Sequence, residues 1–390
     1  MSAQSRLGDQ HLEYPVAALD IEAVRHNVTE MDRYCREMSV SIAPHAKTTM
    51  IDEVLALQLQ QTSTWGLTVA NAVQGRVAAC LGADRILVAN QLVESKDIAW
   101  VAEMANVGKT VLSLVDSVTG VRWLDAALDH ESPASRHSVL LEVGYFGGRC
   151  GARGDDDFDA VAEAVATSRH LVVRGVSGYE GMLGGTASAD LDRVDDYLRR
   201  LASSAARLAE RHGISGSGTI LSAGGSAYFD RVLANCRPVA SQLEATLLLR
   251  SGCYAIHDHG VYARTFPRVR GEGPDLCPAA TVWARILSRP EEARAVAAVG
   301  KRNLPHDADL PTPLGVRYRD GHSAALPSTS RVVLLSDQHL HLEIPADSDL
   351  TVGDVVPLGI SHPCGLFDRW RRITVVDRHK RLLGTVLPAF

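Results

Sequence analysis

Short apolar runs alternate with longer stretches of helical periodicity from about residue 16 to residue 262. The apolar runs are rich in Val, Leu and Ile and end in small or polar residues, which is typical of buried strands. The predicted strands are residues 41–43, 64–69, 85–89, 110–115, 138–143, 172–177, 219–222 and 242–248. The predicted helices are residues 21–36, about 50–60, 72–81, 95–106, 118–128, 156–167 and 189–212.

Eight strands joined by helical crossovers favour a (β/α)8 barrel of the TIM type. A doubly wound open sheet, with the same alternation of strands and helices, is the alternative. In a barrel, active sites are built where strands end and the following helices begin. Polar residues directly after the predicted strands are therefore the first candidates for chemistry. The barrel is expected to span residues 20–262.

The pattern changes after about residue 264. Prolines become frequent, and the apolar runs have no long helices between them. These runs are residues 279–287, 295–299, 331–335, 339–344, 354–358 and 373–376. They predict a C-terminal antiparallel β domain. The run 16–20 is expected to add a strand to this domain, which would then consist of residues 1–19 and 263–390.

The composition of this chain of 390 residues excludes several classes of binding partner. A net charge of −6 gives no reason to expect nucleic acid or an anionic membrane. Residues 1–13 are polar and lack an apolar signal core, and no run approaches the roughly 18 apolar residues of a membrane span. The seven cysteines are scattered, which favours a cytoplasmic protein with free thiols over a disulfide framework. Most are expected to be small buried hydrophobes, with Cys364 as the exception.

Lys47 is the strongest single candidate for chemistry. It lies in the segment PHAKTT, residues 44–49, between a predicted strand and a predicted helix. A lysine at this junction, partly out of water, can form a Schiff base with an aldehyde. The alternative is a solvated lysine in a loop.

A glycine-containing loop follows the strand predicted at 219–222. Its residues Ser222, Gly224, Gly225 and Ser226 are small enough to let backbone N–H groups surround a phosphate. An ordinary tight turn is the alternative.

A third polar segment, residues 251–260, follows the last predicted barrel strand. Tyr254, His257, Asp258 and His259 in this segment are candidates for cofactor or substrate contacts. The alternative is a polar loop in which Asp258 caps a helix. Arg149 and Tyr179, each flanked by glycines after a barrel strand, are further candidates for contacting a flat ring or an anion.

His362 and Cys364 lie two residues apart in an extended segment, so their side chains point to the same side. Both residue types are good Zn²⁺ ligands, and two ligands leave positions open for water or substrate. The alternative is a core histidine and an unrelated thiol.

Together these motifs resemble the D-threonine aldolase and D-serine dehydratase family of pyridoxal-phosphate enzymes, which have the alanine-racemase-like fold. The resemblance covers nearly the whole chain. The matching segments, in the order of the family, are PHAKT with Lys47, GRCG with Arg149, GYEG with Tyr179, residues 222–226, and His362-Pro-Cys364.

The resemblance implies pyridoxal 5′-phosphate held by Lys47 and a metal ion, Zn²⁺ or alternatively Mn²⁺, held by His362 and Cys364. It also implies a D-3-hydroxy amino acid such as D-serine, D-threonine or D-3-hydroxyaspartate as substrate. The aldolase branch tends to have His-x-Asp at the metal motif and the dehydratase branch His-x-Cys. We therefore expect a dehydratase, closest to the bacterial D-serine-deaminase-like branch, that forms a 2-oxo acid and ammonia.

The alternative is a D-threonine-type aldolase that forms glycine and an aldehyde, with His257, His259 or His339 as the base. A racemase and a non-catalytic pyridoxal-phosphate-binding protein are further alternatives, which rank below the dehydratase and the aldolase. In the dehydratase hypothesis Lys47 also acts as the general base. The resemblance further implies a homodimer.

Overall fold

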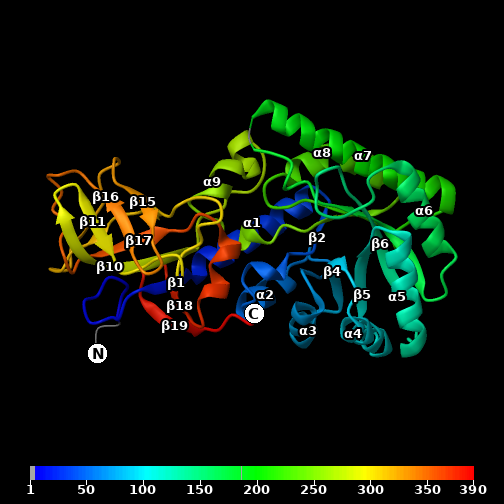
Figure 1. The fold of residues 1–390 in the computed structure, drawn as a ribbon, viewed down its shortest axis with the longest axis horizontal. Helices are drawn as coiled ribbons and strands as arrows, with labels where there is room; N and C mark the ends of the chain where they lie inside the picture. The colour runs from blue at the N-terminus through cyan, green and yellow to red at the C-terminus, as the bar shows by residue number, and fades with distance from the viewer. Residues whose placement is uncertain (1–4, 186) are drawn as a thin grey trace.

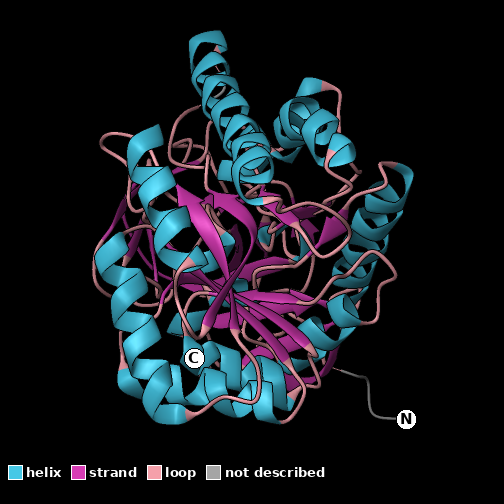
Figure 2. Ribbon diagram, turned by 90° about the vertical axis from the view of Figure 1, so that its right-hand side faces the viewer, coloured by secondary structure: helices cyan, strands magenta, loops and turns pink. Residues whose placement is uncertain are grey.

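The computed structural model of the protein describes residues 5–185 and 187–390. These residues form two lobes, a barrel of strands and helices and an elongated β domain (Figure 1). Seen from the side of the barrel, the helices surround the strands (Figure 2). The two lobes are the architecture that the hydrophobic pattern predicts.

In the described part of the chain, eight parallel strands form one sheet in the order β2-β9-β8-β7-β6-β5-β4-β3. The two ends of this order meet through the bridges Ile42↔Thr64 and His45↔Thr68, so the sheet closes into a barrel. This closure excludes the open doubly wound sheet. The strands are β2 (Ser41–Ile42), β3 (Leu67–Val69), β4 (Arg85–Gln91), β5 (Thr110–Val115), β6 (His137–Val143), β7 (Leu171–Gly178), β8 (Ile220–Ala223) and β9 (Thr246–Leu249).

Helices follow the strands and cover the outside of the barrel (Figure 2). They are α1 (Ile21–Glu37), α2 (Asp52–Leu59), α3 (Ala72–Cys80), α4 (Ser95–Asn106), α5 (Val118–Glu131), α6 (Asp155–Ala166), α7 (Ser188–His212) and α8 (Phe229–Gln242). The short helix α9 (Val261–Thr265) lies between the two lobes (Figure 1). The Asp20 carboxylate starts α1 by accepting the N–H groups of Glu22 and Ala23, each at 3.1 Å.

Helix α8 is absent from the predicted elements because it contains Pro238, which ordinarily ends a helix. Its buried apolar face compensates. Phe229 packs edge-on against Tyr34 and Phe266 at centroid distances of 5.4 and 5.2 Å. The strand predicted at 242–248 is correspondingly wrong at its start, since Gln242 ends α8 and β9 begins at Thr246.

The β domain is mixed rather than purely antiparallel. Strand β1 (Val16–Asp20) pairs antiparallel with β10 and parallel with β18, so the N-terminal run joins this domain as predicted. The other strands are β10 (Ala280–Glu291), β11 (Arg294–Ala297), β12 (Thr312–Pro313), β13 (Val316–Arg317), β14 (Ser323–Ala324), β15 (Arg331–Leu335), β16 (Leu340–Glu343), β17 (Val355–Gly359), β18 (Ile373–Val376) and β19 (Leu382–Val386).

The segment after β17 docks on the barrel at the end where its strands finish. His259 donates its backbone N–H to the carbonyl of Ile360 at 3.0 Å, and Val261 donates to Ser361 at 2.9 Å. These bonds bring the segment with His362 and Cys364 over the barrel mouth. Among the described residues, no helix has the length and apolar character needed to cross a bilayer.

Candidate active site

Lys47 lies at the carboxyl end of β2, as its position in the sequence predicts. A short 3₁₀ turn, Ala46–Thr48, carries it, and the turn is fixed because Thr68 donates its N–H to the carbonyl of Pro44 at 2.9 Å. The neighbours Ala46 and Thr48 are buried, whereas Lys47 is exposed rather than partly out of water as expected. The rigid turn thus presents one amine to the mouth of the barrel.

A cavity of about 240 Å³ opens beside Lys47. It collects residues from both lobes, and seven of the candidates from the sequence line it. They are Lys47, Arg149, Tyr179, Gly225, Ser226, His362 and Cys364.

Two arginines approach the cavity in different ways. The guanidinium of Arg149 lies over the ring of Tyr179, 5.5 Å from its centroid. Arg250, at the end of β9, is buried and donates to Ser177 Oγ at 2.9 Å and to the carbonyl of Gly178. Burial lowers the pKa of Arg250, although Glu180 and Glu142 oppose this effect. Arg250 is missing from the predicted site. A single arginine directly after the apolar run TLLL is the signal that would have found it.

The glycine loop after β8 only partly fits the predicted phosphate cradle. The buried carboxylate of Glu180 accepts the N–H groups of Gly224 at 3.2 Å and Gly225 at 2.7 Å. Those two amides are therefore already occupied, and what faces the cavity is the second half of the loop, Gly225 and Ser226. A Cβ added at Gly225 would lie 3.1 Å from the Tyr179 ring, so a larger residue would narrow the cavity.

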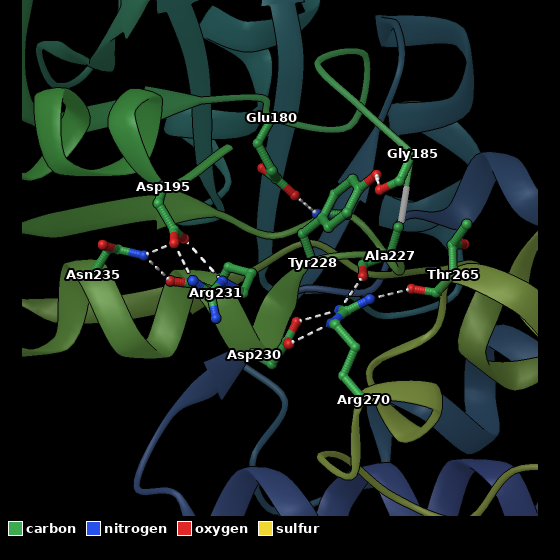
Figure 3. Close-up of polar contacts among 11 residues, drawn as sticks. Glu180, Gly185, Asp195, Ala227, Tyr228, Asp230, Arg231, Asn235, Thr265 and Arg270 are labelled. Carbon is green, nitrogen blue, oxygen red and sulfur yellow. Dashed lines mark hydrogen bonds and ion pairs between the residues drawn. The ribbon is translucent and has the colours of Figure 1, made fainter. Parts of the chain in front are cut away.

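Hydrogen bonds from other parts of the chain fix residues 227–230, which follow this loop. Arg270 donates to the carbonyl of Ala227 at 2.7 Å and pairs with Asp230, and Tyr228 donates its hydroxyl to the carbonyl of Gly185 at 2.9 Å (Figure 3). These contacts fix the start of α8 and thereby the wall of the cavity that Ser226 belongs to.

Three predicted cofactor contacts are buried in the scaffold instead of facing the cavity. Ser222 donates its hydroxyl to the carbonyl of Leu248 inside the barrel wall. Gly224 faces Glu180, as described above. Tyr254 is 2% exposed and packs in the core.

The structure places His257, Asp258 and His259 away from the cavity beside Lys47. They line a separate cavity with Phe266. Asp258 Oδ1 accepts the N–H groups of Gly260, Tyr262 and Ala263, so this residue caps the start of α9, the alternative that the sequence left open. Burial lowers the pKa of His257, and burial together with the charge of His257 lowers the pKa of His259 to about 4.

His362 and Cys364 meet at the cavity with a third residue, Cys253. Their ligand atoms, an imidazole nitrogen and two sulfurs, all lie within 4.8 Å of one another. Asp307 accepts the N–H of His362 Nδ1 at 2.7 Å, which leaves Nε2 for a ligand role. Cys253 and Asp307 are not among the predicted residues, because neither lies near the His-x-Cys segment in the sequence.

Electrostatics distinguish the residues of this cluster. Burial disfavours a charged His362, but hydrogen bonds and charges from Cys364 and Asp307 outweigh it and raise its pKa to about 9. A hydrogen bond with Cys253 and the neighbouring His362 lower the pKa of Cys364 well below that of an ordinary thiol. One nitrogen and two sulfur donors suit Zn²⁺ better than hard cations such as Mg²⁺.

Comparison with known protein families agrees with this architecture. The family described as "Alanine racemase, N-terminal domain" matches residues 19–233, more than half of the chain. The chain belongs to this family. A serine dehydratase domain matches residues 279–376, within the β domain. This pairing of domains is the family resemblance recognised in the sequence.

Among curated proteins, a 3-hydroxy-D-aspartate aldolase of Paracoccus denitrificans strain Pd 1222 is 24% identical over 204 residues. The match covers 52% of this chain and 51% of the aldolase, so the chain aligns with only about half the length of this relative.

Solved structures match over nearly the whole chain. D-threonine aldolase from Filomicrobium marinum has a TM-score of 0.80 at 22% identity and covers 99% of this chain and 98% of its own. D-threo-3-hydroxyaspartate dehydratase from Delftia sp. HT23 has a TM-score of 0.76 at 18% identity and covers 98% and 99%. At these identities the match establishes the alanine-racemase-like fold of a barrel followed by a β domain.

Proposed function

We propose that the protein is a pyridoxal-phosphate-dependent lyase that acts on D-3-hydroxy amino acids with the help of a metal ion. One observation carries the proposal. The Lys47 amine from the barrel and the His362–Cys364 donor pair from the β domain face the same cavity. An amine for a carbonyl cofactor and a site for a hydroxyl-binding metal are the two functions that this chemistry needs.

The residues of the cavity fit pyridoxal phosphate. Lys47 supplies the amine, Arg149 and Arg250 supply positive charge, and Gly225 and Ser226 line a small-residue wall suited to a phosphate. Among the described residues, the buried Nδ1 of His45 beside Lys47 has no hydrogen-bond partner, so a polar group is available to a ligand. When bound, pyridoxal phosphate supplies a ring that accepts negative charge from Cα.

Lys47 has two tasks in this proposal. It holds the cofactor, and once its amine is free it takes the proton from Cα of the substrate as general base. Burial lowers the pKa of the neighbouring His45 well below its ordinary value, so His45 stays neutral and does not compete as a cation. Arg149 and Tyr179 stack on one another at the wall and limit where a flat ring can lie.

His362 and Cys364 would hold the metal ion, which acts as a Lewis acid on the 3-hydroxyl. Asp307 orients His362 through Nδ1. One similar solved structure is a cysteine-to-alanine variant of D-threo-3-hydroxyaspartate dehydratase in a metal-free form, which supports metal binding by an enzyme of this fold.

Specific observations favour each of the two possible bond cleavages. Both matched curated relatives are named 3-hydroxy-D-aspartate aldolase, and this favours cleavage of Cα–Cβ to glycine and an aldehyde. Cys364 favours dehydration, because the dehydratase branch of the family tends to have His-x-Cys at the metal motif. The position of His257 and His259 in a separate cavity also favours dehydration, since the aldolase reaction needs a base at the 3-hydroxyl. The names of the relatives thus support the aldolase alternative better than the dehydratase expected from the sequence.

The deciding experiment uses the purified protein with pyridoxal phosphate, before and after chelation. It is incubated with D-serine, D-threonine and D-3-hydroxyaspartate, and oxo acid, ammonia, glycine and aldehyde are measured together. Metal-dependent formation of either product pair supports the lyase and identifies the bond that breaks. Formation of either product pair that survives chelation would contradict the role of the metal ion, and no turnover of any of these substrates would refute the proposal.

The homodimer implied by the family resemblance remains a prediction. Light scattering at micromolar concentration tests it, and a mass near 42.0 kDa would refute it.

A further inference from the structure

The cluster at the barrel mouth contains a thiol that the His-x-Cys motif does not include. We propose that Cys253 is a third protein ligand of the metal ion, so that the site is a Cys₂His zinc centre with one open position. The role of that open position rests on the proposed function, because it is where the 3-hydroxyl of the substrate would bind. The assignment of the ligands does not depend on it.

The sulfur atoms are close enough to share one ion. Cys253 Sγ lies 3.3 Å from Cys364 Sγ, and both sulfurs lie 3.7 Å from Thr48 Oγ1. Two thiolates bound tetrahedrally to zinc at about 2.3 Å would be about 3.8 Å apart. The pair therefore needs to separate by only about 0.5 Å to bind zinc, a change that side-chain rotation can supply.

The three ligands come from structural elements that hold them rigidly. Cys253 begins the 3₁₀ turn Cys253–Ala255, which follows β9 after residues 250–252, and it is 5% exposed. Gly252 before it packs against the backbone of His45, since a Cβ there would lie 2.4 Å from the carbonyl oxygen. His362 is held from the other side by Asp307 at 2.7 Å. Such a carboxylate partner is typical of a metal-binding histidine.

Other cysteines of the chain, the buried Cys236 and the half-buried Cys277, have different surroundings. Cys236 Sγ in α8 lies 3.6 Å from the carbonyl of Leu198, and Cys277 Sγ lies 3.6 Å from Asn27 Oδ1. In the described part of the chain, the pair Cys253 and Cys364 is the one place where two thiols and a histidine converge.

The third ligand changes the chemistry of the site. Two thiolates balance the charge of Zn²⁺, so the centre is neutral and softer than one with a single thiolate. Thiolates favour Zn²⁺ over Mg²⁺ or Mn²⁺, so the Mn²⁺ alternative is disfavoured. Three protein ligands leave one tetrahedral position, and a Cys₂His zinc centre of this type binds the alcohol oxygen in alcohol dehydrogenase.

The first test measures the ligand shell of zinc in the full-length protein by X-ray absorption at the zinc edge. We expect two sulfur neighbours at about 2.3 Å together with nitrogen or oxygen neighbours at about 2.0–2.1 Å. A shell with one sulfur, with the thiol of Cys253 free to react with a thiol reagent, would overturn the proposal. This measurement needs no variant, so it is independent of folding defects.

The second test compares Cys253→Ser, Cys364→Ser and the control Cys236→Ser. In the cobalt-loaded protein, each of the first two substitutions should remove about half of the thiolate-to-metal absorption, and the control should remove none. Zinc affinity, measured by competition with a chromophoric chelator, should fall at least about 10–100-fold for Cys253→Ser, since even indirect partners of a metal ligand contribute that much. Unchanged absorption and affinity in Cys253→Ser would overturn the assignment. Retained pyridoxal-phosphate absorbance shows that each variant is folded.

The two proposals fail separately in these experiments. Two sulfur neighbours without turnover of any D-3-hydroxy amino acid would leave the zinc ligands standing and refute the function. Metal-dependent turnover with one sulfur neighbour would leave the function standing and refute the role of Cys253.

Discussion

Two polar loops at the same end of the barrel direct their ionisable side chains into different cavities. Residues 44–49 follow β2 and present Lys47 to the cavity. Residues 251–260 follow β9, but only Gly252 and Cys253 reach that cavity, and His257 and His259 line another one. Both loops look alike in sequence, as clusters of ionisable residues after an apolar strand.

The difference lies in the path of the backbone beyond the first few residues. The turn at Cys253–Ala255 and the left-handed conformation of His257, with φ of 50°, redirect the second loop. His259 then donates its N–H to Ile360 and joins the β domain. Lys47 lies five positions beyond β2 and still reaches the cavity, so the path of each turn, and not the distance from the strand end, decides which residues reach the barrel mouth.

The largest expected effect tests this comparison directly. Lys47→Ala should abolish pyridoxal-phosphate absorbance and lower turnover by at least the roughly 10²–10⁴-fold that a positioned proton-transfer group contributes. His257→Asn, at an equally polar loop, should keep the absorbance and most of the turnover. Spectra and rates of both purified variants decide the matter. If His257→Asn were as inactive as Lys47→Ala, the separation of the two cavities would not reflect function.

A carboxylate partner distinguishes a ligand histidine from a packing histidine. His362 Nδ1 binds Asp307, whereas in the part of the chain that the structure describes His259 Nδ1 is buried without a partner. Asp307→Asn should weaken zinc binding by about 10–100-fold and leave cofactor absorbance unchanged. Asp309→Asn, which removes the nearby pair with Arg264, is the matched control for chelator competition. Equal affinities in the two variants would contradict the orienting role of Asp307.

Much of the fold follows from local signals in the sequence, and part of the site does not. The strand ends locate Lys47, Arg149 and Tyr179, because each lies in the loop that follows an apolar run. Cys253 and Asp307 are different, since they belong to the cluster only through the docking of the segment after β17 on the barrel. Nothing in the residues around Asp307 indicates that contact. Helix α8 is also not predicted, because tertiary contacts stabilise it against its local sequence. The burial of Phe229 outweighs the local penalty of Pro238.

The two loops touch at Gly252, and this contact is also testable. A Cβ at this position would lie 2.4 Å from the carbonyl oxygen of His45, a backbone atom that cannot turn aside. Gly252→Ala should lower the free energy of unfolding by about 1–3 kcal/mol and shift the Lys47 turn, with weaker cofactor binding. Gly384→Ala, where a Cβ meets nothing within 4 Å, is the control in urea denaturation. Equal stability of the two variants would mean that the loops are not held by this contact.

The smallest expected effect concerns His259 as a packing residue. Burial, together with the charge of His257, lowers its pKa to about 4, below the ordinary value of 6.5. Between these values the unfolded chain binds a proton that the folded protein does not, so the stabilisation is complete above about pH 6.5 and is lost as the pH falls toward 4. His259→Asn removes this titration. Discounted for the partial exposure of the ring, the loss of stability between pH 7 and pH 4.5 should shrink by about 1 kcal/mol. Urea denaturation at both pH values measures it, with the exposed His130→Asn as control. A His259→Asn variant with the acid sensitivity of the wild type would show that this histidine is not held neutral by the β domain.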